Sequence, residues 1–134
     1  PGIYGMNTNT HIALCDIQMF AHIPNLIYLA PASKAKEKTG LEITVINPRF
    51  LTGLDEELLT QLKENHELVI TLEDGELIGG YGQTIASFYG DINIKVKNYG
   101  ISKAFHTDFK ADELLAENGM SVEQLTAYIK KSVH

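Results

Sequence analysis

The sequence predicts an α/β domain with a mostly parallel sheet, because strand and helix signals alternate between residues 43 and 82. Two short apolar runs rich in β-branched residues, Ile43–Ile46 and Leu68–Leu72, are typical of buried strands. Between them, leucines recur at helical spacing after Asp55, a residue type that caps helices. Strands joined through a helix pair in parallel, so this stretch predicts one complete βαβ crossover.

Turn-forming residues divide the chain after the second run. Glu73–Gly75 is expected to end that strand, with its two adjacent acids in a solvated turn. A glycine-rich turn, Gly79–Gly82, is expected to open a helix that ends at Gly90. Residues Ile92–Lys97 alternate apolar and polar, which predicts a strand with one exposed face, and Asn98–Gly100 is expected to turn the chain.

Two helices are predicted near the C-terminus. The first covers Asp112–Glu117 and is expected to end at Asn118–Gly119. The second starts after Ser121, which forms a capping box with Gln124 three residues later.

Bulk composition predicts a soluble globular domain in the cytoplasm. The chain has 134 residues, 44% hydrophobic and 21% charged, which is the size and balance of one ordinary domain. Its net charge of -6 argues against nucleic acid or an anionic membrane as a partner. The single cysteine, Cys15, forms no internal disulfide, and no apolar run or signal peptide directs the chain to a membrane.

Residues 34–134 carry a resemblance to a known family. It rests on three segments: INPRFLTGLDEELL, ELVITLEDGELIGGYG and IKVKNYGISKAFHTDFKADELLAENGMSVEQL. They resemble the C-terminal domain of the 1-deoxy-D-xylulose-5-phosphate synthase family, thiamine-diphosphate- and Mg²⁺-dependent enzymes related to transketolase. The resemblance implies a three-layer αβα domain with a mostly parallel sheet.

Residues 1–33 resemble a different part of the same family. A short helical pattern followed by IPNLIYLAP is similar to the domain that binds the aminopyrimidine ring of the cofactor. After Ser33 the sequence passes directly to Lys34, where the family has the rest of that domain and the first strand and helix of the next. We therefore expect a segment to be missing at this joint, so that two pieces of one longer enzyme are written together.

The resemblance implies an activity and its partners. Enzymes of this family condense pyruvate with glyceraldehyde 3-phosphate, with loss of CO₂, and work as homodimers. Their product feeds isoprenoid, thiamine and pyridoxal synthesis. No Gly-Asp-Gly metal motif occurs in the chain, so the thiamine diphosphate and Mg²⁺ sites are expected mostly outside it. Another transketolase-family enzyme and a non-catalytic α/β dimerisation module remain as alternatives.

One residue, His11, is the candidate catalytic group. The segment GMNTNTHIALCDI aligns without gaps to a family loop, with matches at Gly5, Thr10, His11 and Asp16. By resemblance, His11 would lie beside the reactive carbon of the thiazolium ring and exchange protons with intermediates, for which an imidazole is suited near neutral pH. The alternative is an ordinary loop histidine bonded to backbone. Asn7–Thr8 and Ile12–Ala13 depart from the family loop.

Other patterns favour structural roles. The turn Gly79–Gly82 follows a strand and opens a helix, as nucleotide-binding turns do, but it lacks the G-x-G-x-x-G spacing. The sequence therefore favours a structural role for these glycines, in tight turning and close helix–sheet packing. Arg49 could bind a ligand at a strand end, although a salt bridge at a domain boundary is favoured. The histidines show no metal-ligand spacing.

Overall fold

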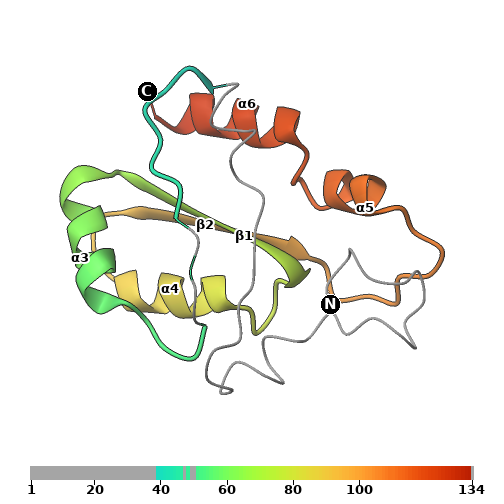
Figure 1. The fold of residues 1–134 in the computed structure, drawn as a ribbon, viewed down its shortest axis with the longest axis horizontal. Helices are drawn as coiled ribbons and strands as arrows, with labels where there is room; N and C mark the ends of the chain where they lie inside the picture. The colour runs from blue at the N-terminus through green and yellow to red at the C-terminus, as the bar shows by residue number, and fades with distance from the viewer. Residues whose placement is uncertain (1–38, 47, 49–50, 134) are drawn as a thin grey trace.

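The computed structural model describes residues 39–46, 48 and 51–133 (Figure 1). The predicted domain fragment at residues 1–33, the joint at Ser33–Lys34, His11 and Arg49 lie outside the described residues. The elements follow in the order α3 (Glu56–Asn65), β1 (Leu68–Glu76), α4 (Tyr81–Tyr89), β2 (Lys95–Ile101), α5 (Ala111–Glu117) and α6 (Val122–Ser132).

The two described strands form a parallel pair joined through α4, which is a βαβ unit. Leu68 pairs with Lys95, and Leu72 pairs with Tyr99. Figure 1 shows α4 along one face of the strands and α6 on the other, where Tyr128 packs edge-on against Tyr99. The predicted αβα arrangement with a parallel sheet is confirmed.

The position of the crossover was predicted wrongly. Residues 43–46 form no strand, and Val45 and Ile46 are each 40% exposed. Their β-branched side chains favour extended backbone, but a strand also needs a partner for its backbone groups, and the described residues provide none. The segment is held instead by its side chains: the hydroxyl of Thr44 lies 3.0 Å from Nε2 of His66.

The turn predicted at Glu73–Gly75 is also wrong, because β1 continues to Glu76. The register between the strands shifts between Leu72 and Glu76, and we call this irregularity of β1 the bulge. The backbone N–H of Leu77 still donates to the carbonyl of Ile101 over 2.9 Å. Turn-forming residues in this sequence therefore produce a bulge rather than a reversal.

The strand predicted over Ile92–Lys97 lies three residues further on. It begins at Lys95 and includes Asn98–Gly100, where a turn was predicted. Asn98 stays in the strand because its side chain accepts a 2.9 Å hydrogen bond from the hydroxyl of Thr71 on β1. A Cβ on Gly100 would lie 2.9 Å from Cα of Leu77, so glycine permits the close approach of the two strands.

The predicted caps of α3 and α6 and the predicted end of α4 are confirmed, whereas α4 begins at Tyr81, so that Gly82 lies inside the helix. The carboxylate of Asp55 accepts from the backbone N–H of Leu58 over 3.0 Å and caps α3. Ser121 and Gln124 form both bonds of the capping box of α6. Gly90 ends α4 with a positive φ of 44°.

Among the described residues, buried side chains gather on both sides of the strands. One group contains Ile101, Leu114 and Met120, all less than 8% exposed, and joins β2 to α5. In the other, Tyr89 of α4 is 1% exposed, and its hydroxyl donates to the carbonyl of Leu59 on α3 over 2.9 Å. This bond satisfies a buried phenol and fixes α3 against α4.

Candidate functional site

The glycine-rich turn before α4 is occupied by a side chain of the same domain. Glu73, in the bulge of β1, directs its carboxylate at the N-terminus of α4. Oε2 accepts from the backbone N–H of Tyr81, and Oε1 accepts from that of Gly82, both over 2.8 Å. These N–H groups have no partner within the helix, and they are the groups that would bind a phosphate in a nucleotide-binding turn. The carboxylate already satisfies them.

The approach of this carboxylate requires glycine at residue 80. A Cβ on Gly80 would lie 2.6 Å from Oε2 of Glu73 and 2.7 Å from Oε1. Glu73 is only 9% exposed and is held by two hydrogen bonds, so it cannot move aside without losing them. The expectation that Glu73 lies in a solvated turn is therefore wrong.

The third glycine of the turn serves helix–sheet packing. A Cβ on Gly82 would collide with the hydroxyl of Thr71 and would lie 3.0 Å from Cγ of Asn98. These two side chains, one from each strand, are hydrogen-bonded to each other directly beneath the helix. The geometry favours the packing role expected for the turn over the nucleotide-binding one.

The side chain of Tyr81 connects the same turn to the start of α3. Its hydroxyl donates to the carbonyl of Gly53 over 3.0 Å. Burial raises the pKa of this phenol, and the negative charge of Asp55 raises the pKa further. The phenol therefore stays protonated and keeps its donor role at physiological pH.

Opposing effects act on the pKa of Glu73. Burial raises the pKa of its carboxyl, the N–H groups of Gly82 and Tyr81 lower it, and the neighbouring charge of Asp74 raises it. Burial is the largest effect, so the folded domain holds a proton on Glu73 at a pH where an unfolded chain has released it.

This shift predicts a pH dependence of stability. The pKa of Glu73 is higher in the folded state than in the unfolded chain. The contribution of this residue to the free energy of unfolding is therefore complete below pH 4.5, the ordinary pKa, and decreases as the pH rises through the folded pKa. We expect the free energy of unfolding of the wild type, minus that of Glu73→Gln, to decrease between acidic and neutral pH. Urea denaturation at a series of pH values measures this difference, and a difference that increases with pH would contradict the assignment.

A pair of glycine substitutions tests the close approach. Gly80→Ala should lower the free energy of unfolding by about 1–3 kcal/mol, because the new methyl group displaces a buried hydrogen-bonded carboxylate. Gly53→Ala is the matched control, since nothing lies within 4 Å of a Cβ at that position. It should leave stability unchanged or raise it slightly. Equal effects of the two substitutions in thermal or urea unfolding would show that Glu73 does not constrain residue 80.

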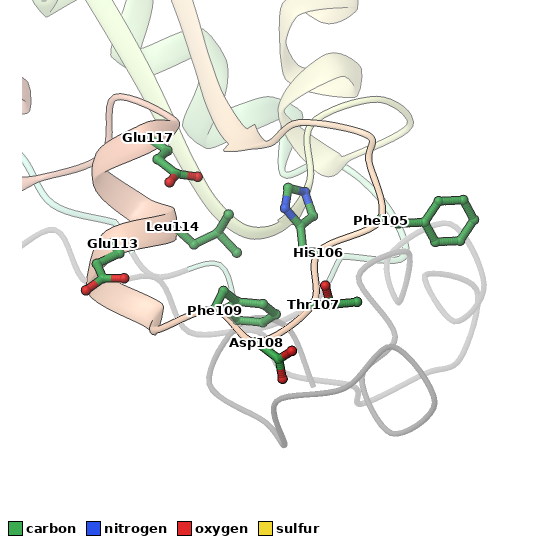
Figure 2. Close-up of a pocket in the computed structure, with 8 residues that line it drawn as sticks. All are labelled: Phe105, His106, Thr107, Asp108, Phe109, Glu113, Leu114 and Glu117. Carbon is green, nitrogen blue, oxygen red and sulfur yellow. The ribbon is translucent and has the colours of Figure 1, made fainter.

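A second feature is a hollow of about 260 Å³ between α5 and the loop after β2 (Figure 2). Its walls include His106 and Phe109, whose rings pack edge to face at 6.4 Å. Nε2 of His106 lies 2.9 Å from the carbonyl of Ser102, which can only accept, so this nitrogen carries the proton. Figure 2 shows Phe105 pointing away from the hollow, and it is 95% exposed.

The charge of the hollow limits what it can bind. Its lining carries three carboxylates, those of Asp108, Glu113 and Glu117. The nearby Lys110 lies outside the lining and donates to Glu113 over 3.0 Å. Anions such as phosphates and carboxylates are repelled from such a surface, so the hollow does not suit a phosphorylated or carboxylate substrate.

The described residues do not fit thiamine diphosphate or its metal. In the part of the chain that the structure describes, no group of three or more His, Cys, Asp or Glu side chains could hold a metal ion. The N-terminus of α4 is filled by Glu73, and the hollow is acidic. No described helix is long and apolar enough to cross a membrane. His11, Arg49 and Cys15 lie outside the described residues, so their predicted roles stay predictions.

Sequence reasoning missed Glu73 as the residue that organises this site. The available signal was an acid at the end of a strand, followed within ten residues by a turn with three glycines. Such a turn presents backbone N–H groups, and a nearby carboxylate can satisfy them.

These features define the domain as an α/β module in which the turn before α4 serves packing. The sequence profile described as "Transketolase, C-terminal domain" matches residues 27–125, and the chain belongs to this family. Among solved structures, "Split gene transketolase, inactive beta4 tetramer" has a TM-score of 0.59 and 25% identity, covering 75% of this chain and 34% of that one.

Curated relatives agree with the resemblance in the sequence. The 1-deoxy-D-xylulose-5-phosphate synthase of Parafrankia sp. (strain EAN1pec) is 33% identical over 96 residues, which cover 70% of this chain and 15% of that protein. The same enzyme of Carboxydothermus hydrogenoformans is 35% identical over 107 residues, which cover 78% of this chain and 17% of that protein. The enzyme of Gloeothece citriformis is 36% identical over 95 residues, which cover 69% of this chain and 15% of that protein. The predicted likeness to the C-terminal part of these synthases is confirmed.

The chain spans a small part of these relatives. Among the synthases compared, it covers between 14% and 17% of their length. Most of each relative therefore has no counterpart in these 134 residues.

Proposed function

We propose that this chain is the C-terminal part of a 1-deoxy-D-xylulose-5-phosphate synthase. The intact enzyme would be a transketolase-type transferase that joins pyruvate to glyceraldehyde 3-phosphate with loss of CO₂. The observation that carries this proposal is the match to curated synthases at 33–36% identity over about two thirds or more of the chain. Thiamine diphosphate and Mg²⁺ would be bound by residues elsewhere in the enzyme.

Within that enzyme the described domain would act as a structural module. Its glycine-rich turn is closed by Glu73, and the hollow beside α5 is acidic, whereas both proposed substrates carry negative charge. The catalytic contribution of this chain would come from His11, which would exchange a proton with the reacting carbonyl groups. The enzyme would work as a homodimer in the cytoplasm.

Substrate dependence of the intact enzyme tests the proposal. Release of CO₂ from pyruvate should require glyceraldehyde 3-phosphate and yield a five-carbon ketose phosphate. A transketolase would instead transfer two carbons between sugar phosphates without releasing CO₂, and a non-catalytic dimerisation module would do neither. Either of the last two results would overturn the assignment.

A further inference from the structure

The end of α5 is joined to the loop after β2 through one side chain. Asn118 follows the helix, and its Oδ1 accepts from the backbone N–H of Ser102 over 2.8 Å. Its Nδ2 donates to the carbonyl of Leu114, also over 2.8 Å. One amide thus connects the start of the 102–110 loop to the last turn of α5, the two segments that border the acidic hollow.

The residue after this amide is glycine, and the pair has a specific chemistry. Asn118–Gly119 is the only Asn-Gly pair in the sequence. Without a side chain on Gly119, its backbone nitrogen can reach Cγ of the asparagine with little steric hindrance. We propose that Asn118 is a site of spontaneous deamidation, and that the two hydrogen bonds of its side chain control the rate.

The reaction needs only water. The backbone nitrogen of Gly119 loses its proton and bonds to Cγ of Asn118, and the Cγ–Nδ2 bond breaks with release of ammonia. Water then opens the cyclic imide at either carbonyl, which leaves aspartate or isoaspartate at residue 118. No oxidant or cofactor takes part.

The folded structure opposes the first step at both atoms that must meet. The N–H of Gly119 donates to the carbonyl of Ala116 over 3.1 Å, so the nucleophile is directed back towards the helix. The amide of Asn118 is fixed at both ends, and Gly119 is held at a φ of 77°. Attack therefore requires local opening of the α5 end, and the rate should follow the population of that open state.

The product would weaken the same connection. A carboxylate at residue 118 can still accept from Ser102, but it has no hydrogen to donate to the carbonyl of Leu114. It would place two oxygen atoms in contact and a negative charge at the C-terminal end of α5, where the helix dipole disfavours it. Deamidation would therefore loosen the loop that borders the hollow, and it would not be reversed.

Peptide mass spectrometry of the full chain, incubated at mildly alkaline pH, tests the proposal. Asn98 is the internal control, because tyrosine follows it. We expect slow deamidation of Asn118 in the native protein and fast deamidation in denaturing urea, with Asn98 unchanged in both. Equal rates at Asn118 in both states, or no reaction in urea, would overturn the proposal.

A variant isolates the hydrogen bond from Ser102. Ser102→Pro removes the N–H donor just after β2 ends, where the preceding residue is already extended. The native rate at Asn118 should rise several-fold and by no more than about tenfold, because one neutral hydrogen bond is lost. An unchanged rate in the folded variant would contradict control by this bond. If the variant does not fold, the wild type is measured instead at increasing, sub-denaturing urea concentrations. The rate of deamidation at Asn118 should then rise in parallel with the rate of amide hydrogen exchange at Gly119. Rates that change independently of each other would contradict control by local opening.

Discussion

Replacement of Glu73 by alanine should lower the free energy of unfolding by about 2–3 kcal/mol, because two hydrogen bonds to a buried carboxyl group are lost at a helix N-terminus. The N–H groups of Tyr81 and Gly82 would be left without the acceptors that now lie 2.8 Å away. Urea denaturation at neutral pH measures the change.

Two further substitutions define the origin of this effect. Glu73→Gln keeps one acceptor oxygen and the shape of the side chain, so its cost should lie between that of alanine and wild type. Glu67→Ala is the matched control, since the side chain of Glu67 is exposed just before β1. If Glu73→Ala cost no more than Glu67→Ala, the carboxylate would not stabilise the turn.

Replacement of His11 by alanine in the intact enzyme should reduce turnover by more than about tenfold, because a positioned general acid–base group would be lost. The reason is the proposed proton exchange with the reacting carbonyl groups. Steady-state kinetics with pyruvate and glyceraldehyde 3-phosphate measure the change.

A second histidine provides the control for this experiment. His22 lies in the same N-terminal part of the sequence but outside the segment that aligns with the family loop. His22→Ala should leave turnover close to that of wild type. Unchanged turnover in His11→Ala, with thermal stability also unchanged, would remove His11 from the mechanism.

The features predicted correctly from the sequence depend on contacts between near neighbours. Asp55 caps α3 through a residue three positions later, and Ser121 and Gln124 are equally close. Such contacts form wherever the helix forms, so residue types at fixed spacing identify them.

The features predicted wrongly depend on pairing between distant segments. Asn98–Gly100 has the composition of a turn, yet it is a strand because Asn98 bonds to Thr71, which lies 27 residues earlier. Residues 43–46 have the composition of a strand but find no ladder partner among the described residues. Tertiary context outweighs local preference in both places.

The candidate site was also predicted only in part from the sequence. The scaffold role of the glycine-rich turn was predicted from its spacing, but its cause, a carboxylate filling the turn, required the fold to place Glu73 against Tyr81 and Gly82. The role of His11 rests on resemblance alone and stays a prediction.

We propose that this domain is a structural module, in which the helix N-terminus behind the glycine-rich turn, at α4, is already filled by Glu73. Titration calorimetry of the 134-residue chain with thiamine diphosphate and Mg²⁺ tests it most directly. We expect no saturable heat, because the turn before α4 is closed by Glu73 and the hollow beside α5 is acidic. Saturable one-to-one binding of the cofactor would contradict the claim.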